Sequence, residues 1–152
     1  MTSHFPHYVL MMIVVVILYF PMCWLMASIS GWRRLASSYH NDGPFDPADW
    51  MVSRAYIRGA LPFHSKFKLR VGADRQYLYL RTWPFSFPGH PELRVPWPEV
   101  SIAEAKVGFW RRCTVRFREC SGVSIQLNAA TVERAVNQAG GQWKDGQPQF
   151  PT

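Results

Sequence analysis

The sequence predicts one transmembrane α-helix followed by a small α+β domain, which is mostly antiparallel β and forms a partly open barrel or sandwich with a C-terminal helix. Three observations support this prediction. A long apolar run lies within the first 30 residues, short segments of alternating apolar and polar residues occupy the middle of the chain, and a segment of helical periodicity follows them. The chain has 152 residues, the size of one domain plus an appendage.

The apolar run from Tyr8 to Ile29 contains no Asp, Glu, Lys, Arg, Asn or Gln. Its length matches the roughly 20 residues that a helix needs to cross about 30 Å of hydrocarbon. A cleaved signal peptide is the main alternative, but such a peptide starts with positive charge and ends in small residues, whereas bulky residues 24–26 precede Ala27. We therefore expect residues 1–30 to form an N-terminal tail and a membrane span, with a kink at Pro21.

The distribution of charge predicts the orientation of this span. No Lys or Arg precedes it, whereas Arg33 and Arg34 follow it directly, and such residues flank membrane helices on the cytoplasmic side. We expect a single-pass protein of the cell inner membrane or an intracytoplasmic membrane, with its N-terminus outside and its C-terminal domain in the cytoplasm. The spacing of Cys23, Cys113 and Cys120 indicates no disulfide framework, which suits that compartment.

Residues 31–49 are predicted to form an interfacial amphipathic segment and a linker. Apolar residues recur at helical spacing after Gly31, at Trp32, Leu35, Ala36 and Tyr39. This pattern predicts a short helix on the membrane surface, with Arg33 and Arg34 near lipid phosphates. A continuous extension of the membrane helix is the alternative. Residues 40–49 are rich in Asn, Asp, Gly and Pro, which is typical of a linker.

The β domain with its C-terminal helix is expected at residues 50–141, and an extended tail at residues 142–152. A first strand is expected at residues 51–59, without a defined register. Residues 67–71 alternate apolar with basic side chains, and residues 76–83 form the next strand, so that the two make a hairpin. A Pro-rich excursion follows, and then a short strand, a Pro-bounded corner and another strand.

The last hairpin is the sharpest local prediction. Residues 112–119 and 123–127 both alternate, and a three-residue loop at 120–122 keeps their apolar residues on one face and the arginines on the other. In this register Phe117 faces Ile125 and Val115 faces Leu127, with Gly122 in a left-handed bulge. A helix follows, capped by Asn128 or Thr131, with its apolar face at Val132, Ala135, Val136 and Ala139.

This order of strands and helix resembles the pleckstrin-homology-like (PH-like) and GRAM-like fold. The chain resembles more closely a group of uncharacterised small bacterial single-pass membrane proteins with a GW-x-x-LA-x-x-Y element after one span and an H-P-x-L-x-x-PW-x-E segment in a β domain. Here Gly31–Tyr39 has the sequence GWRRLASSY and His90–Glu99 has the sequence HPELRVPWPE. The resemblance covers most of the chain beyond the span. It implies a PH-like β domain and no particular activity.

Catalytic and metal-binding patterns are not found in the sequence. It has no phosphate loop, dinucleotide fingerprint, HExxH motif or nucleophile elbow, so we expect no enzyme, no cofactor and no small-molecule substrate. His4 and His7 share helical spacing, but we interpret them as interfacial side chains rather than metal ligands. His90 and Trp97 could face a ligand, and we favour a structural role for them in a Pro-fixed corner.

The strongest charge feature is a group of arginines on the last predicted hairpin, namely Arg111, Arg112, Arg116 and Arg118, with Lys106 upstream. The net charge of +7 lies entirely beyond the span, where a basic surface attracts anionic lipid headgroups or an acidic partner. We expect these arginines to bind a partner or lipid, together with Trp32, Arg33 and Arg34. Nucleic acid is not expected, because no recognition helix or stacking platform is evident.

These features predict a non-catalytic accessory or structural subunit of a larger integral membrane complex, either photosynthetic (reaction-centre or light-harvesting) or respiratory. Such a subunit would dock on other transmembrane subunits through its helix and its cytoplasmic β domain. The 7 tryptophans and 10 phenylalanines exceed the needs of one small core, and docking surfaces favour aromatic residues and Arg. The alternative is a membrane-tethered PH-like module that binds an anionic lipid or peptide.

Overall fold

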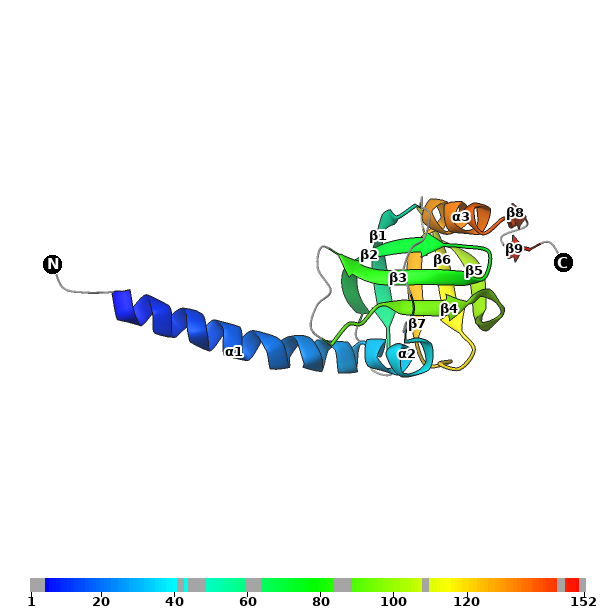
Figure 1. The fold of residues 1–152 in the computed structure, drawn as a ribbon. Coiled ribbons are helices and arrows are strands. Elements are labelled where there is room, and N and C mark those ends of the chain that lie inside the picture. Colours follow the sequence, from blue (N-terminus) through cyan, green and yellow to red (C-terminus); the bar gives the residue numbers. More distant parts are fainter. Residues whose placement is uncertain are drawn as a thin grey trace.

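A long apolar helix, α1 (Phe5–Ile29), projects from one end of a β domain (Figure 1). The computed structural model describes residues 5–40, 43, 49–59, 64–83, 89–107, 110–144 and 147–150. Within these residues, α1 is the one helix long and apolar enough to cross a membrane, from His7 to Ile29, although a signal sequence has the same length and composition. The side chains from His7 to Met22 are all exposed, and the helix continues through Pro21.

Gly31 separates α1 from the second helix, α2 (Trp32–Tyr39). Its φ of +82° lies in the left-handed region, which glycine adopts without a steric penalty. A Cβ atom at this position would also lie 2.7 Å from a methyl group of Val123. The chain therefore turns at Gly31, and the alternative of one continuous helix is wrong.

The apolar side of α2 faces the core of the β domain. Trp32 and Leu35 have exposed fractions of 0%, and Tyr39 has 4%. The apolar side of α2 therefore faces protein rather than lipid, and the position of this helix near the membrane surface stays a prediction. Amphipathic spacing shows only that one side of a helix avoids water, and here the core of the domain supplies the apolar environment.

Seven antiparallel strands form one sheet, which is curled into a half-barrel (Figure 1). The strands are β1 (Met51–Arg58), β2 (His64–Ala73), β3 (Tyr77–Trp83), β4 (Leu93–Pro96), β5 (Val100–Val107), β6 (Trp110–Phe117) and β7 (Ser124–Asn128). Their order is β4-β3-β2-β1-β7-β6-β5, and a 3-10 turn (Trp97–Glu99) precedes β5. The predicted fold class, an apolar helix followed by a mostly antiparallel β domain with a C-terminal helix, is confirmed.

The inner face of the half-barrel is the hydrophobic core. Alternate residues of each strand enter it, including Ile57, Leu69, Val115 and Ile125, all of them at most 1% exposed. Helix α3 (Ala129–Gln138) is capped by Asn128, whose side chain accepts a hydrogen bond from the Ala130 N–H at 3.1 Å. It packs on the sheet at the end opposite α2 (Figure 1).

The pairing of β6 with β7 differs from the predicted register by two residues. Val115 faces Ile125 and Cys113 faces Leu127, so the predicted pair of Phe117 with Ile125 is wrong. Because side chains alternate with a period of two, a shift of two residues leaves each side chain on the predicted face of the sheet. The apolar residues of both strands are therefore buried, as predicted.

The reason for this register is a longer turn anchored on α2. The Glu119 N–H donates to the Tyr39 hydroxyl at 3.2 Å, and the Cys120 thiol donates to the Arg34 carbonyl at 3.5 Å. Gly122 does not have a positive φ, so the predicted bulge does not form.

Beyond α3 the chain forms a small hairpin rather than the expected extended tail. Strand β8 (Gln142–Lys144) pairs with β9 (Gln147–Gln149), and residues 145–146 between them lie outside the described residues. The Phe150 ring then lies 4.8 Å from the ring of Trp97, centroid to centroid. The hairpin thus continues the aromatic packing of the Pro-bounded corner.

An engineered disulfide tests the β6–β7 register. Thr114 lies directly opposite Gln126 in the structure, whereas the sequence-based register places it opposite Asn128. In a background with Cys23 and Cys120 changed to Ser, T114C/Q126C should oxidise to a disulfide, because directly opposed Cα atoms are about 4.5–5.5 Å apart. T114C/N128C should not, because diagonal neighbours are about 7–8 Å apart. Mass spectrometry of linked peptides measures both yields, and the reverse order would refute this register.

Candidate functional site

The outer face of the sheet carries a group of basic side chains that no single segment of the sequence reveals. Along β1, β2 and β6 the inward residues are buried, so the residues between them point outward. We call the resulting surface the cationic face. Its members are Arg54, Arg58, Lys66, Lys68, Arg70, Arg112 and Arg116.

The strand register places these residues in rows across the sheet. One row contains Lys66, Tyr56, Gln126 and Thr114. On one side of it, Arg58, Ser124 and Arg116 form a second row. On the other side, Arg54 faces Lys68 and Arg112 faces Asn128. Basic residues therefore surround a centre made of Tyr56 and Gln126.

Two features make the cationic face electrostatically unfavourable for the isolated domain. Arg54 lies directly opposite Lys68, and such a like-charge pair destabilises a sheet. Among the described residues, no carboxylate lies within 4.0 Å of the charged groups of Arg54, Lys66 or Arg112. An anion bound from outside would relieve this repulsion.

Tyr56 links cations from two other strands. The Arg112 guanidinium carbon lies 4.6 Å from the centroid of the Tyr56 ring, and the Lys66 ammonium lies 5.9 Å from it. Beside the ring is a cavity of about 330 Å³, lined among others by Arg54, Arg112 and Gln126. Guanidinium and amide N–H groups suit a carboxylate or phosphate oxygen. The described residues contain no group of His, Cys, Asp and Glu suited to a metal ion.

The predicted arginine group is divided between two faces. Arg112 and Arg116 belong to the cationic face. Arg111 points the other way, where its Nε lies 2.6 Å from Oε1 of Glu104 and its Nη2 lies 2.9 Å from Oε1 of Glu133. These carboxylates raise the pKa of Arg111 and neutralise its charge. The sequence could not show this, because the two glutamates lie on β5 and α3.

Arg118, also in the predicted group, lies at the edge of the cationic face. Arg118 follows β6, where its backbone N–H donates to the Glu99 carbonyl at 2.9 Å. It lines a hollow of about 450 Å³ together with Arg116. The side chain of Lys106 lies outside the described residues.

Near α1, the arginine pair is exposed but Trp32 is not. The Arg33 guanidinium carbon lies 4.2 Å over the Trp24 ring of α1, and Arg34 lies near the β6–β7 turn. The Trp32 indole N–H donates to the Pro91 carbonyl at 2.9 Å inside the domain. The prediction that Trp32 contacts lipid or a partner is therefore wrong, because its side chain is fully buried.

The Pro-bounded corner has the structural role that the sequence favoured. His90 is 3% exposed, with its ring 5.7 Å from that of Trp32 and 5.4 Å from that of Phe67. Trp97 is 6% exposed, and its indole N–H donates to the Asp74 carbonyl at 2.8 Å. Both residues belong to the framework of the domain.

Asp74 holds the β2–β3 turn together. Its Oδ1 accepts from the backbone N–H groups of Gln76 and Tyr77 at 2.8 and 2.7 Å, and its Oδ2 accepts from the Tyr79 hydroxyl at 2.5 Å. Burial acts to raise the pKa of Asp74, but these hydrogen bonds and the nearby Arg94 outweigh it and lower the pKa. Burial and Asp74 together raise the pKa of Tyr79 to about 12.

No protein-family model, curated protein or solved structure matches this chain.

Asp74 should make the stability of the domain depend on acid pH. At pH 7 D74N should lower the free energy of unfolding by about 1–2 kcal/mol, because a charged acceptor of three hydrogen bonds is lost. The folded-state pKa is lowered, so this stabilisation is complete above the unfolded value of about 3.9 and is lost as the pH falls through the folded value.

The difference between wild type and D74N should therefore shrink below about pH 4. Urea unfolding of the full chain in detergent, followed by circular dichroism, measures it, with R75Q as a control in the same turn. A difference that stays constant from pH 7 to pH 3 would refute this role.

Proposed function

We propose that the protein is a membrane-anchored, non-catalytic accessory subunit whose cationic face docks on an acidic surface of another subunit in an integral membrane complex. The observation that carries the proposal is the cationic face itself, with basic residues from three strands around Tyr56 and Gln126. Tyr and Arg are enriched among residues that dominate binding at protein interfaces. An acidic partner would supply the charge that the domain lacks.

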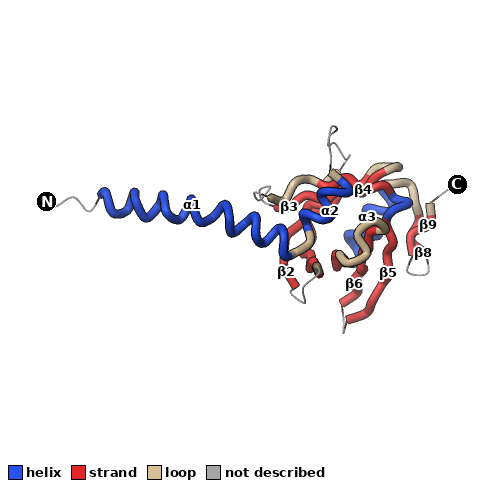
Figure 2. Tube along the Cα trace, turned by 90° about the horizontal axis from the view of Figure 1, so that it is seen from below, coloured by secondary structure: helices blue, strands red, loops and turns tan. Residues whose placement is uncertain are grey.

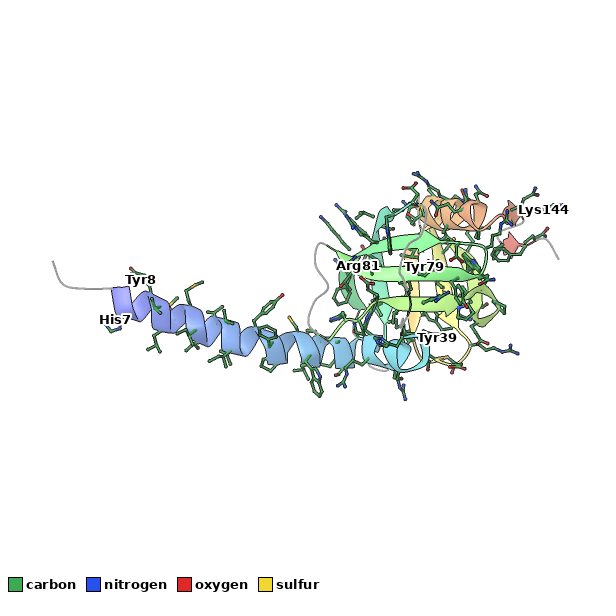
Figure 3. All side chains as sticks on the ribbon, viewed as in Figure 1. His7, Tyr8, Tyr39, Tyr79, Arg81 and Lys144 are labelled. Atoms are coloured by element: carbon green, nitrogen blue, oxygen red, sulfur yellow. The ribbon has the colours of Figure 1, made fainter. Side chains whose placement is uncertain are left out.

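The direction of β2 favours a neighbouring protein over the bilayer for the part of the cationic face on this strand. Strands β2 and β3 run approximately along the direction of α1 (Figure 1). The outer face of this part of the sheet therefore looks sideways, toward neighbours in the membrane, if α1 crosses the bilayer. Figure 3 shows Arg81 toward the α1 end of β3 and Lys144 at the far end of the domain.

The junction between α1 and the β domain supports a permanent anchor rather than a cleaved signal sequence. Cys23, Ala27 and Ser30 are buried against the domain. A Cβ atom on Gly59 would lie 2.7 Å from the carbonyl group of Ser30, so strand β1 ends in close contact with the helix end. Cleavage near Ala27 would remove part of this packing.

The proposal includes a PH-like module and a cytoplasmic location for the β domain. Seven strands followed by a helix are the basis of the resemblance to PH-like and GRAM-like domains. Arg33 and Arg34 are exposed beside the end of α1, where the positive-inside rule places them in the cytoplasm. The N-terminus then lies outside.

Charge removal tests docking through the cationic face. R54Q/R112Q removes two cations from the walls of the 330 Å³ cavity, whereas the matched control R75Q/K144Q removes two exposed cations elsewhere. A photo-crosslinker at Gln126 in the full chain should link to one protein of the native membrane, through an acidic segment of that protein. R54Q/R112Q should reduce the cross-link about tenfold or more, and the control should not. The wild-type cross-link should weaken at 0.5 M salt.

Three results would contradict docking. They are an unchanged cross-link in R54Q/R112Q, an equal loss in the control, and a crosslinker at Gln126 that reacts only with lipid. Both variants should unfold within about 0.5 kcal/mol of the wild type, because the changed side chains are exposed or half-buried.

Cysteine labelling tests the orientation. Cys120 is 9% exposed and a poor target, so S121C, at a neighbouring exposed position, should be used with Cys23 and Cys120 changed to Ser. A membrane-impermeant maleimide should label S121C only after cell lysis. H7C, at the other end of α1, should react in intact cells. The opposite pattern would show that the β domain faces outward.

A further inference from the structure

A groove lies between the end of α1 and strand β2. Tyr19, Met22, Cys23 and Met26 of α1 line one wall, and the other wall, around a volume of about 320 Å³, is lined by Lys66, Phe67, Lys68 and His90. Figure 2 shows β2 beside the end of α1. One wall is therefore the apolar surface of a membrane helix, and the other combines two lysines with Phe67 and His90.

The ends of the strands explain why this groove exists. Strand β2 begins before its pairing with β3, because the first β2 residue with a described β3 partner is Lys68, which faces Trp83. Lys66 and Phe67 therefore lie beyond the end of β3, toward α1. Helix α1 turns Cys23 and Ala27 toward the domain, whereas Tyr19, Met22 and Met26 stay 46%, 58% and 40% exposed. The apolar wall of the groove thus continues along the outer surface of the span.

The position of the lysines along α1 points to the lipid they would meet. The side chains of α1 are exposed up to Met22, and Cys23 and Ala27 are buried against the domain, so the domain begins beside the last two turns of the helix. If α1 crosses a bilayer, hydrocarbon gives way to headgroups at this level, where Lys66 and Lys68 line the groove. A cation at this depth is unfavourable unless an anion accompanies it. Among the described residues no carboxylate pairs with either lysine.

We propose that this groove holds one anionic phospholipid, with its phosphate between the Lys66 and Lys68 ammonium groups and an acyl chain along Tyr19, Met22 and Met26. Lysine is a suitable point charge for a phosphate, and the thioether side chains adapt to a flexible chain. The Lys66 ammonium also lies 5.9 Å from the Tyr56 ring, so the headgroup would occupy a corner of the cationic face. This lipid site does not depend on the docking partner proposed above.

Native mass spectrometry of the full chain tests the site after reconstitution in vesicles of equal parts phosphatidylglycerol and phosphatidylcholine. The wild type should retain one phosphatidylglycerol per chain, enriched roughly tenfold over phosphatidylcholine. K66Q/K68Q should lose the enrichment, and K66R/K68R should keep it. R75Q/K144Q removes the same charge at other exposed positions and should also keep it.

A second variant separates the groove from general charge attraction. M22W narrows the groove and leaves both lysines in place, so it should lower phosphatidylglycerol retention. The proposal is overturned if K66Q/K68Q retains the lipid, if R75Q/K144Q loses it equally, or if M22W has no effect. It is also overturned if soluble glycerol phosphate displaces the lipid at equal concentration, since that result would show a headgroup site without the groove. R54Q/R112Q should keep the lipid even where docking is lost, so the two proposals fail separately.

Discussion

Burial of Trp32 beneath the half-barrel determines where the β domain lies relative to α1. Gly31 ends α1 with a φ of +82°, and Trp32 follows it into the core at 0% exposure. Its indole N–H donates to Pro91, and its ring packs against His90, so α2 is joined to the segment before β4. A domain attached only through a linker would turn freely. Here β2 is held beside α1, and both the groove and the direction of the cationic face depend on that contact.

The sequence predicts most of the fold, because alternation and helical spacing are local properties. The strand at residues 67–71, the buried set around Val115 and the helix after Asn128 follow from such patterns, and the structure confirms them. The errors concern contacts between distant segments. The β6–β7 register is set by a turn that binds Tyr39, 80 residues earlier in the chain. Spacing alone also cannot tell whether the apolar side of α2 faces lipid or protein.

The candidate site was predicted only in part for the same reason. Arg112 and Arg116 follow from the alternation in one segment, but their neighbours on the cationic face come from β1 and β2, and the pairing of β1 with β7 brings them together. Arg54, Tyr56 and Arg58 alternate in the sequence as well, yet nothing local places them beside Gln126. The groove was also beyond sequence analysis, because it needs the position of α1 relative to Lys66.

Arg111 and Arg112 show why the functional argument rests on unpaired charge rather than on the number of arginines. They are adjacent in the sequence and point to opposite faces, because strand side chains alternate. Arg111 lies between Glu104 and Glu133, and these two carboxylates of the same domain pair with its charge at an exposed position. The Arg112 guanidinium lies over the Tyr56 ring, which attracts a cation through its quadrupole. Because the ring has no net charge, it does not neutralise Arg112. An external anion can therefore bind only those basic side chains that are not already paired with a carboxylate of the domain. In the described residues, these side chains are concentrated on the outer face of β1, β2 and β6.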